Sequence, residues 1–219
     1  MAELHVICHE NRHLYQDVLE DYWHIRHDVY VRERRWMELE KPDGREIDQF
    51  DTAATIYLMA LEGRRVVGSH RLVPTTEPTL MSELFPHLSL KGIIRQPDVY
   101  ELSRVFVVKE RRGESASPRI ESVIMAGTME YALLEGLSQF TIVMETWWLP
   151  RFMDMGWNPR PLGLPVDING MSCVGVTVDV SEEAWRDTCA GRSIAGTVLA
   201  WNGVSPSLRA MPGRLARTG

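Results

Sequence analysis

Apolar and polar positions along the first half of the chain form blocks that predict one strand, one helix and a hairpin. Residues 3–8, ELHVIC, read as a short strand. The apolar positions of residues 14–31 recur at helical spacing and predict an amphipathic helix: Leu14, Val18, Leu19, Tyr22, Ile25, Val29 and Tyr30. The apolar runs TIYLMALEG and VVGSHRLVP meet near Gly63 and predict a β-hairpin.

The second half alternates strands and helices. Residues 77–97 look like an irregular or short helical excursion, and YELSRVFVV then predicts a strand. A helix is expected over residues 115–137, with Ser117 before Pro118 as cap and first-turn residue. QFTIVMET predicts a strand, WLPRFMDMG a short helix that ends at Gly156, and residues 171–180 a late strand. Ser181 is expected to cap the helix EEAWRDTCAG.

This alternation, with one hairpin, is typical of a three-layer α/β fold with a mixed sheet. We expect residues 1–204 to form a single domain. Residues 205–219, with their Pro, Gly, Arg and Ser, are expected to be a flexible tail.

Composition argues against several classes of protein. The 219 residues include 30 acidic and 24 basic side chains, a net charge of −6, so the chain as a whole lacks the basic character of a nucleic-acid binder. Its three cysteines are scattered without CxxC spacing, which favours a reducing compartment. The N-terminus lacks the apolar stretch of a signal peptide, and no run approaches the ~20 apolar residues of a membrane span, so we expect a cytoplasmic protein.

The first candidate site lies between residues 32 and 55, where periodicity fails. This charged stretch is long for an idle connection, and Trp36 and Phe50 give it aromatic rings to pack. Asp48 and Asp51, with nearby arginines, are suited to an amino-acid-like ligand, whose amine would meet a carboxylate and whose carboxylate would meet an arginine. Composition alone favours the alternative of a solvated charged loop.

The second candidate is the stretch ELSRVFV, which places Glu101 and Arg104 in a strand expected to be buried. Arg71, late in the preceding strand, is a plausible partner for Glu101. A buried ionic cluster of these three residues is as well explained by structure as by function. In an ideal strand Glu101 and Arg104 point to opposite faces, so either a bulge redirects one of them or both flank one ligand.

Weaker features follow. The loop VVKERRGESASPRIES opens a helix and is able to present amides to an anion, although one glycine favours an ordinary capped helix. The histidines form no ligand pattern with carboxylates or cysteines, so we expect no metal. Trp147, Trp148, Met144, Met153 and Met155 are read most simply as core, with an apolar acyl pocket as the alternative.

Taken together, these motifs resemble the signature of the acyl-homoserine-lactone synthases, the LuxI-type autoinducer synthases. The ordered strings are RxxVYVxERxW, EIDQFD, GSHRL, LFP and ELSRVFV, over roughly residues 20–160. They contain Arg26, Tyr30, Trp36, Asp48, Asp51, Arg71, Phe85, Glu101 and Arg104. Tyr30 stands where many members have Phe.

The resemblance implies a GNAT-like three-layer α/β/α fold with a central mixed, twisted sheet. It implies that the amine of S-adenosylmethionine attacks an acyl thioester to give an amide. The methionyl carboxylate then attacks the γ-carbon, which closes the lactone and expels methylthioadenosine. S-adenosylmethionine is therefore a substrate, and no cofactor is expected.

The resemblance also implies residue roles. Glu101 is the candidate base, with Asp48 and Arg71 as further catalytic candidates, although Arg71 and Asp51 are better suited to organising the pocket than to reacting. The residues expected to bind S-adenosylmethionine are Arg26, Tyr30, Trp36, Asp48, Asp51 and Arg104. Those expected to bind the acyl group or thioester are Phe85, Ser103, Val105, Phe106, Arg111, Arg112, Met144, Thr146, Trp147 and Trp148.

The acyl donor stays open between acyl carrier protein and acyl-CoA. Lys109, Arg119 and Arg151 suit either, and the Trp147–Trp148 pair favours a short, branched or aryl acyl group. Two rival classes are a conventional GNAT N-acyltransferase that uses acyl-CoA and a non-catalytic module that only binds ligand.

Overall fold

The structure, a computed structural model, describes residues 2–113 and 118–200. Over these residues the strands form one mixed sheet in the order β6-β8-β5-β4-β3-β2-β1-β9, and β7 also pairs with β8. The pairs β4–β5 and β1–β9 are parallel and the other pairs are antiparallel. The strands are β1 Glu3–Ile7, β2 Ile56–Glu62, β3 Arg65–Pro74, β4 Val99–Val107, β5 Gln139–Glu145, β6 Arg160–Pro161, β7 Val166–Ile168, β8 Met171–Asp179 and β9 Leu199–Ala200.

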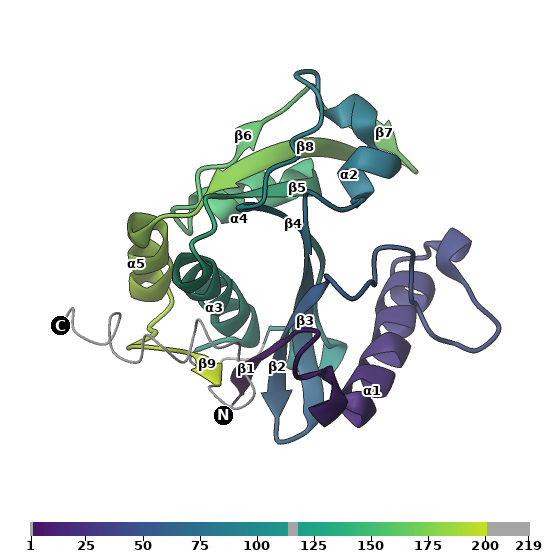
Figure 1. Cartoon of the computed structure of the whole chain (residues 1–219), viewed down its shortest axis with the longest axis vertical. Coiled ribbons are helices and arrows are strands. Elements are labelled where there is room, and N and C mark those ends of the chain that lie inside the picture. Colours follow the sequence, from purple (N-terminus) through teal and green to yellow (C-terminus); the bar gives the residue numbers. More distant parts are fainter. Residues whose placement is uncertain (1, 114–117, 201–219) are drawn as a thin grey trace.

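Helices cover both faces of this sheet, which confirms the predicted three-layer α/β/α fold. Figure 1 shows α1 and α2 on one side of β3 and β4, and α3 and α5 on the other. The α-helices are α1 Gln16–His27, α2 Leu80–Glu83, α3 Ile120–Glu135, α4 Leu149–Met153 and α5 Glu182–Gly191. Shorter turns are η1 Arg12–Leu14, η3 Met37–Leu39, η4 Pro86–Leu88, η5 Lys109–Arg111 and η6 Thr146–Trp148, and η2 Asp28–Glu33 is a π-helical turn.

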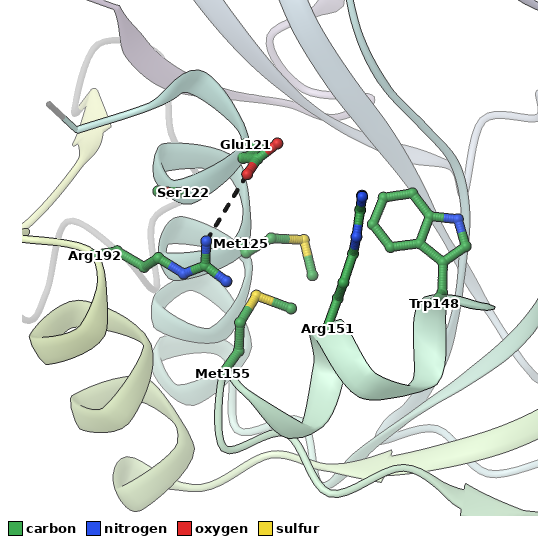
Figure 2. Close-up of a pocket in the computed structure, with 7 residues that line it drawn as sticks. All are labelled: Glu121, Ser122, Met125, Trp148, Arg151, Met155 and Arg192. Atoms are coloured by element: carbon green, nitrogen blue, oxygen red, sulfur yellow. Dashed lines mark ion pairs between the residues drawn. The ribbon is translucent and has the colours of Figure 1, made fainter. Parts of the chain in front are cut away.

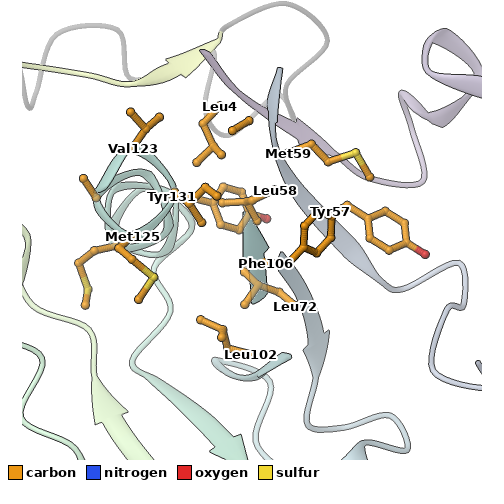
Figure 3. Packing of buried hydrophobic residues seen from close by; sticks show 14 of the residues in the cluster. Leu4, Tyr57, Leu58, Met59, Leu72, Leu102, Phe106, Val123, Met125 and Tyr131 are labelled. Atoms are coloured by element: carbon orange, nitrogen blue, oxygen red, sulfur yellow. The ribbon is translucent and has the colours of Figure 1, made fainter. Parts of the chain in front are cut away.

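The helix α3 is central because it is apolar on nearly every side, as a helix packed in a core must be. Figure 3 shows its residues Val123 and Tyr131 in the cluster with Leu4 of β1 and Leu102 of β4. A Cβ added at Gly127 would lie 2.4 Å from a methyl of Leu4, so only glycine allows helix and strand this close.

Most predicted elements are confirmed, with differences at their ends. The helix α1 ends at His27 and continues as the π-helical turn, and Leu14 belongs to a separate 3-10 turn that precedes it. The helix α3 begins at Ile120 rather than residue 115, and the predicted cap Ser117 lies outside the described residues. Ser181 caps α5 as predicted, since its hydroxyl accepts from the amide of Ala184.

The short strands β6, β7 and β9 were not expected, because two or three residues carry no readable period. The expected tail, residues 205–219, lies outside the described residues. Within residues 2–113 and 118–200, none of the helices combines the length and the apolar character needed to cross a membrane.

Candidate active site

A bulge in β4 creates the geometry of the site. Ser69 pairs with Phe106 and Arg71 pairs with Ser103, so β4 carries one more residue than β3 over this interval. Arg104 takes up the extra residue with a φ of 55°, in the left-handed region that a bulky residue rarely adopts. Strict alternation would turn Arg104 away from Ser103, whereas the bulge brings its guanidinium to the side of the sheet that α1 covers. The bulge expected as one alternative is therefore present.

Three arginines and three carboxylates meet on this face, beneath α1. Arg104 Nη2 lies 3.0 Å from Glu46 Oε1 and 2.8 Å from Asp48 Oδ2. Arg26 contacts Glu46 at 2.5 Å through Nε. Further ion pairs of the cluster are Arg26–Asp51 at 2.8 Å, Arg26–Asp48 at 3.8 Å, Arg71–Asp48 at 2.6 Å and Arg71–Asp51 at 3.1 Å. The loop of residues 32–55 therefore folds its charges inward, so the solvated loop favoured by composition is the wrong reading.

Burial and charge oppose each other in this cluster, and charge prevails. Burial alone would raise the pKa of Glu46, but the positive charges of Arg104 and Arg26 outweigh it and bring the pKa down to about 2. The same balance, with Arg26 and Arg71 as the cations, lowers the pKa of Asp51. The carboxylates of Glu46 and Asp51 are thus ionised at neutral pH.

The cluster is accessible at one edge. The side chain of Asp48 is 10% exposed and that of Arg104 is 6% exposed, whereas those of Glu46 and Asp51 are each 1% exposed. Among the described residues, the buried Nη2 of Arg71 has no hydrogen-bond partner, so it is a spare donor. A ligand with one positive and one negative group would find both kinds of partner here.

Glu101 is buried beside the cluster but does not pair with it. Its two carboxylate oxygens accept from the amides of Leu80 and Met81, each at 2.8 Å, and so cap the first turn of α2. Arg71 instead contacts Asp48 and Asp51, so the predicted Arg71–Glu101 pair is wrong. Register makes Arg71 and Glu101 diagonal neighbours, because Arg71 stands opposite Ser103 and Glu101 opposite Val73, but the amides of Leu80 and Met81 already occupy the Glu101 carboxylate.

The pKa of Glu101 responds to this position. Burial raises it above the usual glutamate value, although the hydrogen bonds from Met81 and Leu80 act in the opposite direction. Of the two influences that the sequence left open, desolvation therefore wins. A carboxylate with a raised pKa is a better proton acceptor near neutral pH.

An aromatic pair lies beside Arg104. Trp36 and Tyr30 are stacked with ring centroids 5.2 Å apart, and the Arg104 guanidinium lies 5.2 Å from the Tyr30 ring. The Tyr30 hydroxyl donates to the carbonyl of Val105 at 3.1 Å, which fastens the pair to the bulged part of β4. Trp36 is the partly exposed ring of the pair and is placed to meet a cationic group of a ligand, whereas Tyr30 is buried.

The strands β4 and β5 part next to the bulge. Their pairing runs from Val99–Gln139 to Leu102–Ile142 and extends no further, although β4 continues to Val107 and β5 to Glu145. Ser103 and Val105 thus lie where the strands separate, and Met144 lies on the facing part of β5. Ser103 Oγ accepts from Arg71 Nε at 3.2 Å, which joins this gap to the ion cluster.

The other acyl candidates are dispersed. Phe106 packs against Tyr22 and Tyr30 beneath α1, and Phe85 lies beyond the end of α2. Met144 and Met155 are buried as predicted for core, whereas Met153 is 62% exposed and Trp147 is 44% exposed, which corrects the core reading for those two.

The two arginines predicted to bind the donor are engaged elsewhere. Arg111 pairs with Glu62, and Arg112 Nη1 lies 2.6 Å from Glu33. Their positive charges are therefore partly neutralised by neighbouring strands and turns.

A small, partly open cavity of about 30 Å³ lies between α3, α4 and α5. It is lined by Glu121, Ser122, Met125, Trp148, Arg151, Met155 and Arg192. Figure 2 shows Met125 and Met155 side by side and Arg151 alongside the Trp148 ring, 5.1 Å from its centroid. Arg192 lies 3.8 Å from Glu121. The cavity thus combines an apolar floor with a partly cationic rim.

Sequence reasoning missed Glu46 and most of this cavity. Glu46 stands in the quoted string EIDQFD, two residues before Asp48, and its place in that motif was the available signal. Tyr57 was also missed, although its hydroxyl donates to Asp51 at 2.9 Å.

The comparison with protein families decides the identity. A model described as autoinducer synthase matches residues 10–187, which contain the whole ion cluster, the bulge and the aromatic pair. The chain belongs to the autoinducer synthase family. The predicted family and its acyltransferase class are confirmed.

Sequence identity to two relatives supports the same family assignment. The isovaleryl-homoserine lactone synthase of Bradyrhizobium diazoefficiens is 48% identical over 181 residues, which cover 82% of this chain and 81% of that protein. An acyl-homoserine-lactone synthase of Acinetobacter nosocomialis is 30% identical over 163 residues, 71% of this chain and 88% of that protein.

Solved structures extend the comparison. A CoA-dependent acyl-homoserine lactone synthase, determined with SAM and isopentyl-CoA, superposes with a TM-score of 0.89 at 42% identity, covering 96% of this chain and 98% of that one. A Lactobacillus plantarum protein assigned as an N-acetyltransferase superposes with a TM-score of 0.54 at 20% identity, covering 82% of this chain and 99% of that one, which supports the GNAT-like fold alone.

Proposed function

We propose that this autoinducer synthase transfers an acyl group from acyl-CoA to the amine of S-adenosylmethionine and then closes the homoserine lactone. One observation carries the proposal: a charge-balanced, buried cluster opens at Asp48 and Arg104 beside stacked aromatic rings, where β4 and β5 separate. S-adenosylmethionine has an amine, a carboxylate and a sulfonium, and each meets a suitable partner in this arrangement.

The acceptor is held by complementary charge. The Asp48 carboxylate receives the substrate amine, and the guanidinium groups of Arg104 and Arg71 receive the substrate carboxylate. The faces of Trp36 and Tyr30 take the sulfonium or the adenine ring. Arg26 and Asp51 hold the other members of the cluster in place, because their side chains are paired with each other and only 0% and 1% exposed.

Acyl transfer needs a base and an oxyanion partner. The amine nitrogen attacks the thioester carbonyl, the C–S bond breaks with release of the thiol, and the amine proton passes to Glu101 directly or through water. A bulge leaves a residue out of the ladder, so amides at Arg104 and Val105 are candidates to stabilise the oxyanion. The substrate carboxylate then attacks the γ-carbon, and methylthioadenosine leaves with the sulfur.

The donor is assigned to acyl-CoA with a short, branched acyl group. Arg151 and Arg192 line the small cavity between α3, α4 and α5 and suit the phosphates of acyl-CoA, with Met125 and Met155 beside them for apolar contact. Arg111 and Arg112 are paired with carboxylates, which leaves less free positive charge for an acidic carrier protein. The relatives named for isovaleryl-homoserine lactone synthesis and for dependence on CoA support the same choice.

Two further expectations belong to the proposal. S-adenosylmethionine is consumed as a substrate, and the reaction needs no additional cofactor. The enzyme works in the cytoplasm, where both substrates are made, and its three free cysteines, all buried, fit a reducing compartment.

The experiment combines the purified protein with S-adenosylmethionine and a panel of acyl-CoAs and acyl carrier proteins, and it measures methylthioadenosine. We expect release with isovaleryl-CoA to exceed release with straight-chain acyl-CoAs and acyl carrier proteins. Absence of methylthioadenosine with every donor would refute the synthase assignment, and preference for a carrier protein would refute the choice of donor.

A further inference from the structure

The turn after η2 crosses the gap between β4 and β5. It connects the acceptor side of the site, with Tyr30 and Trp36, to the donor side at the end of β5. Arg34 follows the π-helical turn, and Arg35 after it has a φ of 63°, so the backbone reverses sharply. The Arg34 guanidinium lies 5.5 Å from the Tyr30 ring and 5.6 Å from the Trp36 ring. Arg34 therefore rests on the aromatic pair assigned to the acceptor.

The same guanidinium reaches the other strand. Arg34 Nη1 lies 3.5 Å from Glu145 Oε1, and the two side chains are 29% and 14% exposed. Glu145 ends β5 and directly precedes Thr146–Trp148, the turn that carries candidate acyl-binding residues. Because Tyr30 is fastened to Val105 of β4, Arg34 bridges β4 and β5 where their own pairing has ended.

A second contact crosses from the same segment. Asn169 Nδ2 donates to Glu38 Oε1 at 3.3 Å, which ties η3 to the turn between β7 and β8. Both crossing contacts are long and partly exposed, so they break and reform more readily than the buried ion cluster. The segment 34–39 is thus a strap across the gap, held to β5 and the β7–β8 turn by these two weak polar contacts and to β4 through the rings of Tyr30 and Trp36.

We propose that Arg34 is a positioning residue that couples the acceptor site to the donor site; the inference rests on the proposed function. A ligand on the Tyr30–Trp36 face orders the strap through Arg34, and Arg34 in turn fixes Glu145 at the start of the donor-side turn. The first ligand bears the entropy cost of this ordering, and the second binds an already ordered protein. Binding of the two substrates is therefore mutually favourable, and the effect is reciprocal.

The test measures S-adenosylmethionine binding by calorimetry, alone and with a saturating thioether analogue of isovaleryl-CoA that is unable to transfer its acyl group. In the wild-type protein we expect the analogue to tighten binding roughly 5-fold or more. The ratio of the dissociation constants for S-adenosylmethionine without and with the analogue measures the coupling. In Arg34→Met and in Glu145→Gln this ratio falls close to one, and in the double variant it falls no further than in either single variant. Arg34→Lys, which keeps the charge, restores part of it.

Arg32→Met is the matched control. Arg32 stands two residues before Arg34, in η2, is 70% exposed and pairs with Asp28 instead of crossing the gap, so the ratio stays at the wild-type value. If Arg34→Met abolishes binding of S-adenosylmethionine, Glu145→Gln becomes the test of the coupling, because this variant leaves Arg34 on the Tyr30 and Trp36 rings. The coupling is overturned if the ratio measured in the wild-type protein is one. It is also overturned if Glu145→Gln keeps the ratio of the wild-type protein. Failure to bind either ligand at all overturns the proposed function instead.

Discussion

Glu101 and Arg104 stand three positions apart on β4, yet their charged groups bind different parts of the protein. The Glu101 carboxylate accepts from the amides of Leu80 and Met81 at 2.8 Å, and Arg104 Nη2 lies 2.8 Å from Asp48. The bulge at Arg104 makes this possible, because it turns the arginine toward the cluster while the glutamate stays against α2. A candidate base and a candidate substrate-binding cation are thereby placed beside one gap.

Replacing Glu101 by Gln should lower turnover by roughly 10²- to 10⁴-fold, the usual contribution of a general base. The variant should still fold, although one oxygen of the carboxylate becomes an NH2 group facing an amide donor. Methylthioadenosine release reports turnover, and circular dichroism reports folding. The control is Glu130→Gln, another buried glutamate, which accepts from the amide of Val198 on the far side of α3. Wild-type turnover in Glu101→Gln would exclude Glu101 as the base.

Acid should destabilise the protein through Glu46. Its pKa is about 2 in the folded protein and 4.5 when unperturbed, so the unfolded chain binds the proton first as pH falls. The stabilisation is fully present above pH 4.5 and is lost as pH falls toward 2, a loss of ~3 kcal/mol for this group. Urea unfolding between pH 2 and 6 measures it. Glu46→Gln should be less stable at neutral pH and should show a shallower acid dependence; an unchanged slope would contradict this assignment.

Trp36 and Tyr30 should respond differently to substitution. Trp36→Ala removes an aromatic face for the substrate cation, and we expect KM for S-adenosylmethionine to rise about tenfold, since such contacts contribute about 1–2 kcal/mol. Tyr30→Phe keeps its ring and loses the hydrogen bond to Val105, so activity should persist with a stability loss of about 1 kcal/mol. Steady-state kinetics and thermal unfolding separate the two effects. Equal losses of activity in both variants would argue against a role for the ring faces.

Arg151 should affect the donor alone. Arg151→Ala removes a cation from the rim of the cavity and should raise KM for acyl-CoA several-fold, more at low than at high salt, with KM for S-adenosylmethionine unchanged. Arg186→Ala is the control, because Arg186 lies on the exposed face of α5 and pairs with Glu182. An equal effect of the two variants would mean that the cavity does not receive the donor.

Local patterns predicted much of this protein. Apolar runs predicted the hairpin and the long strands, and the Ser181 cap followed from local turn chemistry. Asp48, Arg71 and Arg104 were all singled out, and the structure brings them into contact. The beginning of α3 was predicted five residues too early, because the sequence alone does not mark the boundary between the loop and the helix.

The sequence by itself determined the elements, the family and the kinds of charge in the site, because periodicity, turn residues and ordered motifs are properties of neighbouring positions. Only the tertiary structure decided which charges meet. Strand register makes Arg71 and Glu101 diagonal neighbours, yet the amides of Leu80 and Met81 bind Glu101, and the folded loop brings Asp48 to Arg71 and buries Glu46 between Arg26 and Arg104. Register and long-range packing depend on the whole sheet, so no short stretch of sequence carries them.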